Sequence, residues 1–169
     1  MQIEMLKLLF KTLALAPIIT PSVLGDSFIP TLHNSHSQLR EEVRYCKYDK
    51  ECAKIAEVIV YESRGEPARG RRLVGSVVLN RVKDKRFPNT IEEVVHQRRQ
   101  FSYLNDMHKQ KKPTNKDWQK AYFDATILLK GDVEGDILWY HSRKVKPSWS
   151  ESLEVSHRVG NHIFYKDDR

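Results

Sequence analysis

Two glutamates four residues apart are the strongest candidates for chemistry in this chain. Glu62 and Glu66 lie in the stretch YESRGEP at residues 61–67. Apolar residues precede Glu62 by seven, four and three positions, a spacing that places them on its side of a helix. They are Ile55, Val58 and Ile59. Because such a stripe removes Glu62 partly from water and disfavours its charged form, we predict that Glu62 can hold a proton and donate it to a leaving group.

Glu66 has different neighbours, which favour its ionised form. Gly65 suits the end of one helix, and Pro67 suits the first turn of the next. A carboxylate near a helix N-terminus tends to stay ionised. Two carboxylates in opposed environments are what cleavage of a glycosidic bond requires. The same spacing also fits a solvated glutamate at a helix end followed by a turn residue, so the motif alone leaves both interpretations open.

Helical patterns position these glutamates. The sequence predicts long helices over residues 50–64, after Pro67 and after Thr114. A capping-box pattern at Thr90 predicts a further short helix. Two aromatic stretches, residues 136–141 and 161–165, are suited to a small β-ribbon. We therefore predict a single mainly helical α+β domain with a β-ribbon near its C-terminus.

The N-terminal residues have the pattern of an export signal. Residues 1–25 combine a short polar start with an apolar run that Lys11 interrupts, and the run is too short for a permanent membrane span. We expect a cleaved secretory signal, with an uncleaved membrane anchor as the alternative, and export to the periplasm or cell envelope. A linker or N-terminal extension over residues 26–44 and one domain over residues 45–169 complete the expected organisation.

The basic composition indicates a polyanionic partner but does not identify which one. The formal net charge is +7 and the sequence pI is about 9.4. A basic surface attracts polyanions, which include nucleic acid, anionic membranes and the acidic polymers of a bacterial wall. No helix-turn-helix, zinc-finger or aromatic RNA-binding signature is present, and an export signal argues against nucleic acid as a partner. A basic module that binds the wall or nucleic acid without catalysis stays as the non-enzymatic alternative.

Metal and thiol chemistry have little support in the sequence. The two cysteines, Cys46 and Cys52, are too few for a metal knuckle, and no histidine stands at ligand spacing beside them. In an exported protein they could form a disulfide, whereas the phase of Cys52 with nearby apolar residues also fits a core thiol. His157 and His162 are five residues apart, which does not bring two ligands together on a helix. We therefore expect no metal and no cofactor.

Five motifs, in order along the chain, carry a family resemblance. They are YESRGE at 61–66, GSVVLNRV at 75–82, RFP at 86–88 with TI at 90–91 and VV at 94–95, QFSY at 100–103, and the closing pair WYH at 139–141 and GNHIFY at 160–165. From about Cys52 to Tyr165 the chain thereby resembles the SleB-like cell-wall hydrolases, which include spore cortex-lytic enzymes and many phage and bacterial relatives. Ser63 departs from the alanine usual in that family and makes the Glu62-Ser63 pair similar to that of the wider lytic-transglycosylase group.

The resemblance implies a fold, an activity and a set of site residues. The fold is that of the lysozyme and lytic-transglycosylase group, and the activity is cleavage of the β-1,4 bond between N-acetylmuramic acid and N-acetylglucosamine in peptidoglycan. Glu62 is then the catalytic acid, and Glu66 is a secondary, supporting residue. Gln100, Ser102 and Tyr140 are the expected substrate contacts, because amide, hydroxyl and aromatic groups suit a sugar. The expected partner is a peptidoglycan glycan strand, bound by a monomer.

Two routes of cleavage start from the same acid. In a lytic transglycosylase, ionised Glu62 next activates the 6-hydroxyl of the muramic acid, which yields a 1,6-anhydro product; this is the route we expect. In a muramidase it activates water, and inversion would need a second carboxylate roughly 6.5–9.5 Å away, for which Glu66 is the nearby candidate. A zinc amidase that frees peptides from muramic acid is a further alternative, which insensitivity to chelators would exclude.

Overall fold

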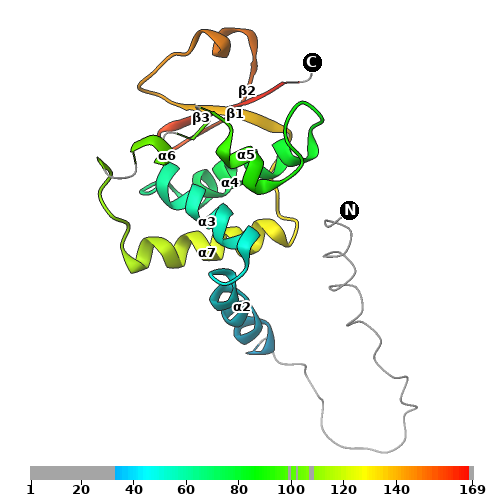
Figure 1. Ribbon diagram of the computed structural model, residues 1–169, viewed down its shortest axis with the longest axis vertical. Coiled ribbons are helices and arrows are strands. Elements are labelled where there is room, and N and C mark those ends of the chain that lie inside the picture. The colour runs from blue at the N-terminus through cyan, green and yellow to red at the C-terminus, as the bar shows by residue number, and fades with distance from the viewer. Residues whose placement is uncertain (1–32, 99, 102, 107–108, 168–169) are drawn as a thin grey trace, which may run out of the picture. The chain divides into compact units, whose positions relative to one another are not determined.

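Helices make up most of the fold, and a small sheet packs on them (Figure 1). The computed structural model describes residues 33–98, 100–101, 103–106 and 109–167, and the expected signal or anchor over residues 1–25 lies outside them. The elements in chain order are α2 (His33–Cys46), α3 (Lys50–Glu62), α4 (Ala68–Lys83), α5 (Ile91–His96), α6 (Tyr103–Asp106), α7 (Asn115–Leu129), β1 (Ile137–Ser142), the 3₁₀ helix η2 (Ser148–Ser152), β2 (Glu154–Val159) and β3 (His162–Lys166).

Helix α3 forms the centre of the core. It packs against both α4 and α7, and the apolar positions predicted to share a face with Glu62 are completely buried. These are Ile55, Val58 and Ile59. Gly75 of α4 permits the close approach, because a β-carbon there would lie 2.4 Å from Leu128 Cδ1 of α7. The apolar stripe seen in the sequence is therefore the side of α3 that anchors it between two helices.

The predicted helix starts are confirmed by their caps. Pro67 occupies the N-cap position of α4. The Thr90 side chain accepts a hydrogen bond from the Glu93 amide at the start of α5. Thr114 and Asp117 form a complete capping box at the start of α7, in which each side chain accepts from the other residue's amide. Short polar signals in the sequence thus set where these helices begin.

The sheet is antiparallel, with strand order β1-β3-β2. The two stretches predicted to form a ribbon are β1 and β3, which pair with Tyr140 opposite Phe164. Strand β2 was not predicted. It lies at the edge of the sheet, and all of its residues are exposed or half-buried. Its sequence therefore lacks the alternation of apolar residues that marks a strand with one buried face.

Helix α2 occupies most of the segment for which the sequence suggested a linker or extension ending at residue 44. It belongs to the same compact unit as the rest of the described chain and contacts both α7 and α3. Glu42 forms an ion pair with Lys130, and Cys46 is joined to Cys52 by a disulfide. The helix is polar along most of its length, so no apolar stripe announces it in the sequence.

The mainly helical α+β architecture with a minor C-terminal β element is confirmed, with a third strand added to the expected ribbon. Among the helices of the described chain, none is both long enough and apolar enough to cross a membrane.

Candidate active site

Glu62 is the last residue of α3, and the next residue ends the helix. The Ser63 amide and hydroxyl both donate to the Ile59 carbonyl, at 3.0 and 2.6 Å. Ser63 is only 1% exposed, and the Ile59 carbonyl gives its buried hydroxyl the hydrogen-bond partner that it needs. The Glu62 side chain is thereby presented from the end of a rigid, buried helix rather than from a loop.

Two donors from distant parts of the chain meet the Glu62 carboxylate. The Tyr103 amide at the start of α6 lies 3.4 Å from Oε1, and the Tyr140 hydroxyl of β1 lies 3.3 Å from Oε2. The carboxylate is half-buried. Burial, followed by the negative charge of Glu62, raises the pKa of Tyr140 well above its ordinary value. Tyr140 therefore stays protonated at neutral pH and acts as a hydrogen-bond donor to Glu62.

The sheet holds Tyr140 in place. Its ring packs 5.7 Å from the ring of Phe164, which is fully buried on the paired strand β3. It also meets His162 edge-on at 5.4 Å. With the ring fixed on two sides, the hydroxyl has little freedom to leave Glu62.

A buried arginine, Arg81, lies behind β1. It is 3% exposed, its Nε donates to the Leu138 carbonyl at 2.9 Å, and its guanidinium lies 5.0 Å from the ring of Trp139. Burial lowers the pKa of Arg81 to about 10, so Arg81 remains charged at neutral pH. Its positive charge opposes, but does not cancel, the rise in the pKa of Tyr140. Arg81 was not predicted as a site residue, although an arginine inside the apolar run VVLNRV at residues 77–82 was a signal for it.

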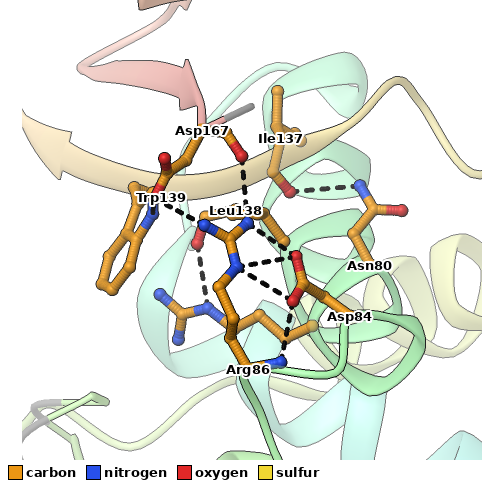
Figure 2. Close-up of polar contacts among 8 residues, drawn as sticks. Asn80, Asp84, Arg86, Ile137, Leu138, Trp139 and Asp167 are labelled. Carbon is orange, nitrogen blue, oxygen red and sulfur yellow. Dashed lines mark hydrogen bonds and ion pairs between the residues drawn. The ribbon is translucent and has the colours of Figure 1, made fainter. Parts of the chain in front are cut away.

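A polar cluster fastens β1 to the end of α4 (Figure 2). Arg86 pairs with Asp84 at 2.7 Å and with Asp167 at 3.0 Å, and the Trp139 indole donates to Asp167 at 3.4 Å. Asn80 of α4 donates to the Ile137 carbonyl at 3.1 Å. These contacts fix the strand that carries Tyr140 relative to the helices, so they position the site without touching Glu62.

Glu66 has a different environment from Glu62. It is 8% exposed, and both of its oxygens accept hydrogen bonds from Asn161, from the backbone amide and from Nδ2, each at 2.9 Å. Gly160, with φ of +55°, leaves room for this contact, because a β-carbon there would lie 1.6 Å from Glu66 Oε2. The carboxylate therefore holds the turn between β2 and β3 against the start of α4, so these contacts stabilise the fold.

The other predicted contact residues are placed as follows. Tyr140 is brought into contact with Glu62, as described above. Gln100 is half-buried in the turn between α5 and α6, beside the fully buried Phe101. Ser102 lies outside the described residues.

The described histidines and carboxylates do not gather into a metal site: no group of three or more His, Cys, Asp or Glu side chains in this part of the chain could hold an ion. His141 of the WYH motif uses both ring nitrogens within the sheet. Nδ1 donates to the Ser142 carbonyl at 2.8 Å, and Nε2 lies 2.7 Å from the Tyr165 hydroxyl, which donates to it. His141 therefore serves as a hydrogen-bonded part of the scaffold.

Comparison with known proteins gives a consistent set of relatives. A family model described as Cell Wall Hydrolase matches residues 65–165. The spore cortex-lytic enzyme of Bacillus cereus is 35% identical over 113 residues, which are 66% of this chain and 42% of that protein. The spore cortex-lytic enzyme of Bacillus subtilis (strain 168) is 30% identical over 111 residues, which are 65% of this chain and 35% of that protein. The chain thus spans about two fifths of the length of these curated relatives, or less.

Two solved structures share the fold. The catalytic domain of the Bacillus cereus SleB protein matches with a TM-score of 0.55 and 33% identity, over 66% of this chain and 86% of that one. The catalytic domain of the germination-specific lytic transglycosylase SleB from Bacillus anthracis matches with a TM-score of 0.56 and 33% identity, over 67% and 91%. The match covers nearly all of each catalytic domain.

Proposed function

Because the chain belongs to the cell wall hydrolase family, we propose that it degrades peptidoglycan by cleaving the β-1,4 bond between N-acetylmuramic acid and N-acetylglucosamine. The relatives are named for lysis of the spore cortex, and one solved relative is described as a lytic transglycosylase. We propose the same transglycosylase route here, with Glu62 as the only acid and base. Export through residues 1–25 would bring the enzyme to this substrate.

In the proposed reaction one proton leaves Glu62 and one returns to it. Protonated Glu62 donates to the glycosidic oxygen, and the bond to C1 of the muramic acid breaks through an oxocarbenium-like state. The carboxylate that remains then takes the proton of the 6-hydroxyl on the same muramic acid. Oxygen O6 bonds to C1, which forms the 1,6-anhydro ring and restores protonated Glu62. Tyr103 and Tyr140 steady the carboxylate through both steps.

The observation that carries this proposal is the contrast between the two glutamates. Glu62 ends a buried helix, is half-buried, and accepts hydrogen bonds of 3.4 and 3.3 Å from Tyr103 and Tyr140, which lie 41 and 78 positions away in the sequence. Glu66 is only 8% exposed, and both of its oxygens accept shorter hydrogen bonds, of 2.9 Å, from Asn161, so Glu66 is poorly suited to activate a water. A route that needs no second carboxylate fits this arrangement better than inversion does.

Substrate contacts by Gln100, Ser102 and Tyr140 are part of the same proposal. An amide and a hydroxyl can hydrogen-bond to N-acetyl and ring hydroxyl groups. Tyr140 adds a ring surface next to the reacting carboxylate.

Product analysis tests the proposed reaction. Purified peptidoglycan is digested with the native protein and with Glu62→Gln, and the released fragments are identified by mass spectrometry. We expect anhydro-muropeptides from the native protein and none from Glu62→Gln. Glu51→Gln is the matched control, since Glu51 is exposed in the first turn of the same helix and should leave the products unchanged.

The other products would contradict the proposal in distinct ways. Reducing muramic acid ends would identify a muramidase and return Glu66 to consideration as a base. Intact glycan with freed peptides, lost on addition of a chelator, would identify a zinc amidase. Steeply salt-dependent binding of DNA without any fragment released would support the non-enzymatic module.

A further inference from the structure

A cavity lies along the side of α3 that faces away from the core. It is a groove of about 520 Å³ between α3, α5 and α7. Its walls include Lys54, Glu57, Tyr61, Glu92, Trp118 and Tyr122. Its volume falls in the range of about 300–1,000 Å³ that is typical of small-molecule sites. Glu62 is not one of its lining residues, because it points to the sheet side of the helix.

One wall of the groove is aromatic. The rings of Trp118 and Tyr122 stack at 5.6 Å and 27°, and the ring of Tyr61 meets Trp118 almost perpendicularly at 6.1 Å. All three side chains are half-buried, so each packs against the core and still offers surface to the groove. A wall of this kind suits a ligand with a flat apolar face.

The charged part of the lining is polar, and its charges cancel. Lys54 Nζ lies 3.1 Å from Glu57 Oε2 and 3.8 Å from Glu92 Oε1. Lys50 is the second lysine of the lining, so the groove contains two ammonium groups and two carboxylates. These groups supply several donors and acceptors without a net charge, which suits a neutral ligand rich in hydroxyl and amide groups.

The stacked rings of Tyr61 and Tyr103 connect the groove to the proposed catalytic glutamate. Tyr61 directly precedes Glu62, and its ring stacks on that of Tyr103 at 5.0 Å with only 7° between the planes. The Tyr103 amide donates a hydrogen bond to Glu62. A ligand that rests against Tyr61 is therefore one layer of side chains from the reacting carboxylate.

We propose that this groove binds a saccharide, namely a stretch of peptidoglycan glycan strand away from the bond that is cut. N-acetylglucosamine is neutral, has an apolar C–H face for the aromatic wall, and has hydroxyl and acetamido groups for the polar part of the lining. A stem peptide carries net charge and would fit a groove of net charge better. This inference rests on the proposed function, since it takes the glycan strand as the substrate.

A binding titration tests the groove separately from catalysis. The parent is the Glu62→Gln variant of the full chain, which cannot cleave by the proposed route, and the probe is the linear tetramer of N-acetylglucosamine. Binding is measured by calorimetry in the parent, in Tyr122→Ala and in Tyr122→Leu, which keeps an apolar side chain but loses the ring. Phe123→Ala is the control, because Phe123 is the next residue on α7, is 39% exposed and does not line the groove.

We expect both Tyr122 variants to lose at least fivefold in affinity while Phe123→Ala binds like the parent. Equal affinity in all four folded proteins overturns the proposal. Binding of a stem tetrapeptide in the parent, lost in both Tyr122 variants, overturns the saccharide assignment and makes the groove a peptide site. Either failure leaves the proposed cleavage intact, because product analysis with the native protein tests that reaction independently.

Discussion

The reacting group in this account is a single carboxylate whose surroundings come from three separate parts of the chain. Glu62 receives the Tyr140 hydroxyl from β1 and the Tyr103 amide from α6. The sequence predicted the apolar stripe that buries α3, because that stripe is local. It could not predict that Asn161 would donate hydrogen bonds to the Glu66 carboxylate, since the two residues are 95 positions apart in the sequence and meet only in the folded protein.

Removing the hydroxyl of Tyr140 should slow catalysis without unfolding the sheet. Tyr140→Phe keeps the ring contacts with Phe164 and His162 but loses the hydrogen bond to Glu62. A hydrogen bond to a charged group contributes about 1.5–3 kcal/mol, so we expect kcat on peptidoglycan to fall about 10-fold to 100-fold.

Tyr165→Phe is the matched control for this prediction. It removes a buried tyrosine hydroxyl that bonds to His141 and not to Glu62. Its kcat should stay within a few-fold of the native value, measured by release of soluble fragments. Equal losses of kcat in the two variants would show that the effect comes from the sheet as a whole.

At the scale of elements, the sequence predicted best where a local signal exists. The capping residues Thr90 and Thr114 and the aromatic strands β1 and β3 were read correctly. The misses, α2 and β2, are polar elements at the margin of the fold. Helix α2 packs on α7, which is distant in sequence, and β2 pairs with the neighbouring strand β3, but neither element has an apolar pattern of its own.

A buried ion pair joins α4 to α7 and should be important for stability. Asp124 has no exposed surface, and Arg71 Nε lies 2.6 Å from its Oδ2, with Arg72 at 3.7 Å from Oδ1. Asp124→Ala leaves two largely buried guanidinium groups without this partner. We expect the free energy of unfolding to fall by about 3 kcal/mol in a denaturant titration.

Asp132→Ala provides the comparison for that variant. Asp132 lies 4.0 Å from Arg72, but its side chain is 66% exposed. An exposed ion pair of this kind contributes at most about 1 kcal/mol to the free energy of unfolding. If the two variants were destabilised equally, burial of Asp124 would not be the cause.

His162 of β3, which lies near Glu66, should make the stability of the fold depend on pH. Burial lowers the pKa of His162 below its ordinary value, although the nearby charge of Glu66 opposes the shift. Above pH of about 6.5 this histidine is neutral in both the folded and the unfolded chain. As the pH falls below that value, the unfolded chain takes up a proton that the folded chain resists, so the free energy of unfolding decreases.

His162→Gln removes this titrating group and isolates its effect. Unfolding is measured by denaturant titration at pH 7 and pH 5 in the native protein and in the variant. We expect the loss of stability between the two pH values to be smaller in the variant. A loss at least as large in the variant would mean that His162 does not contribute in the predicted direction.

At the scale of the molecule, the disulfide ties α2 to the helix that carries Glu62. Cys46 and Cys52 enclose a short loop, for which the chain-entropy relation predicts about 2 kcal/mol of stabilisation. Cys52 and Glu62 are ten residues apart on α3, which is about 15 Å along a helix. Reduction with dithiothreitol should therefore lower the free energy of unfolding by about 2 kcal/mol and leave kcat nearly unchanged.

The double variant Cys46→Ala/Cys52→Ala serves as the control, since its stability should not respond to dithiothreitol. Unfolding midpoints are compared with and without the reductant. A loss of kcat on reduction, at a temperature where the protein stays folded, would mean that α2 affects the site directly.

The most direct test of the central claim compares Glu62→Gln with Glu66→Gln. Both are measured for release of soluble fragments from peptidoglycan and for melting temperature. We predict that Glu62→Gln loses about 10²-fold to 10⁴-fold in activity with an unchanged melting temperature, as for removal of a general acid. Glu66→Gln should instead melt at a lower temperature, because it weakens the contacts with Asn161, and should keep most of its activity where it is folded. An active Glu62→Gln beside a folded but inactive Glu66→Gln would contradict the account.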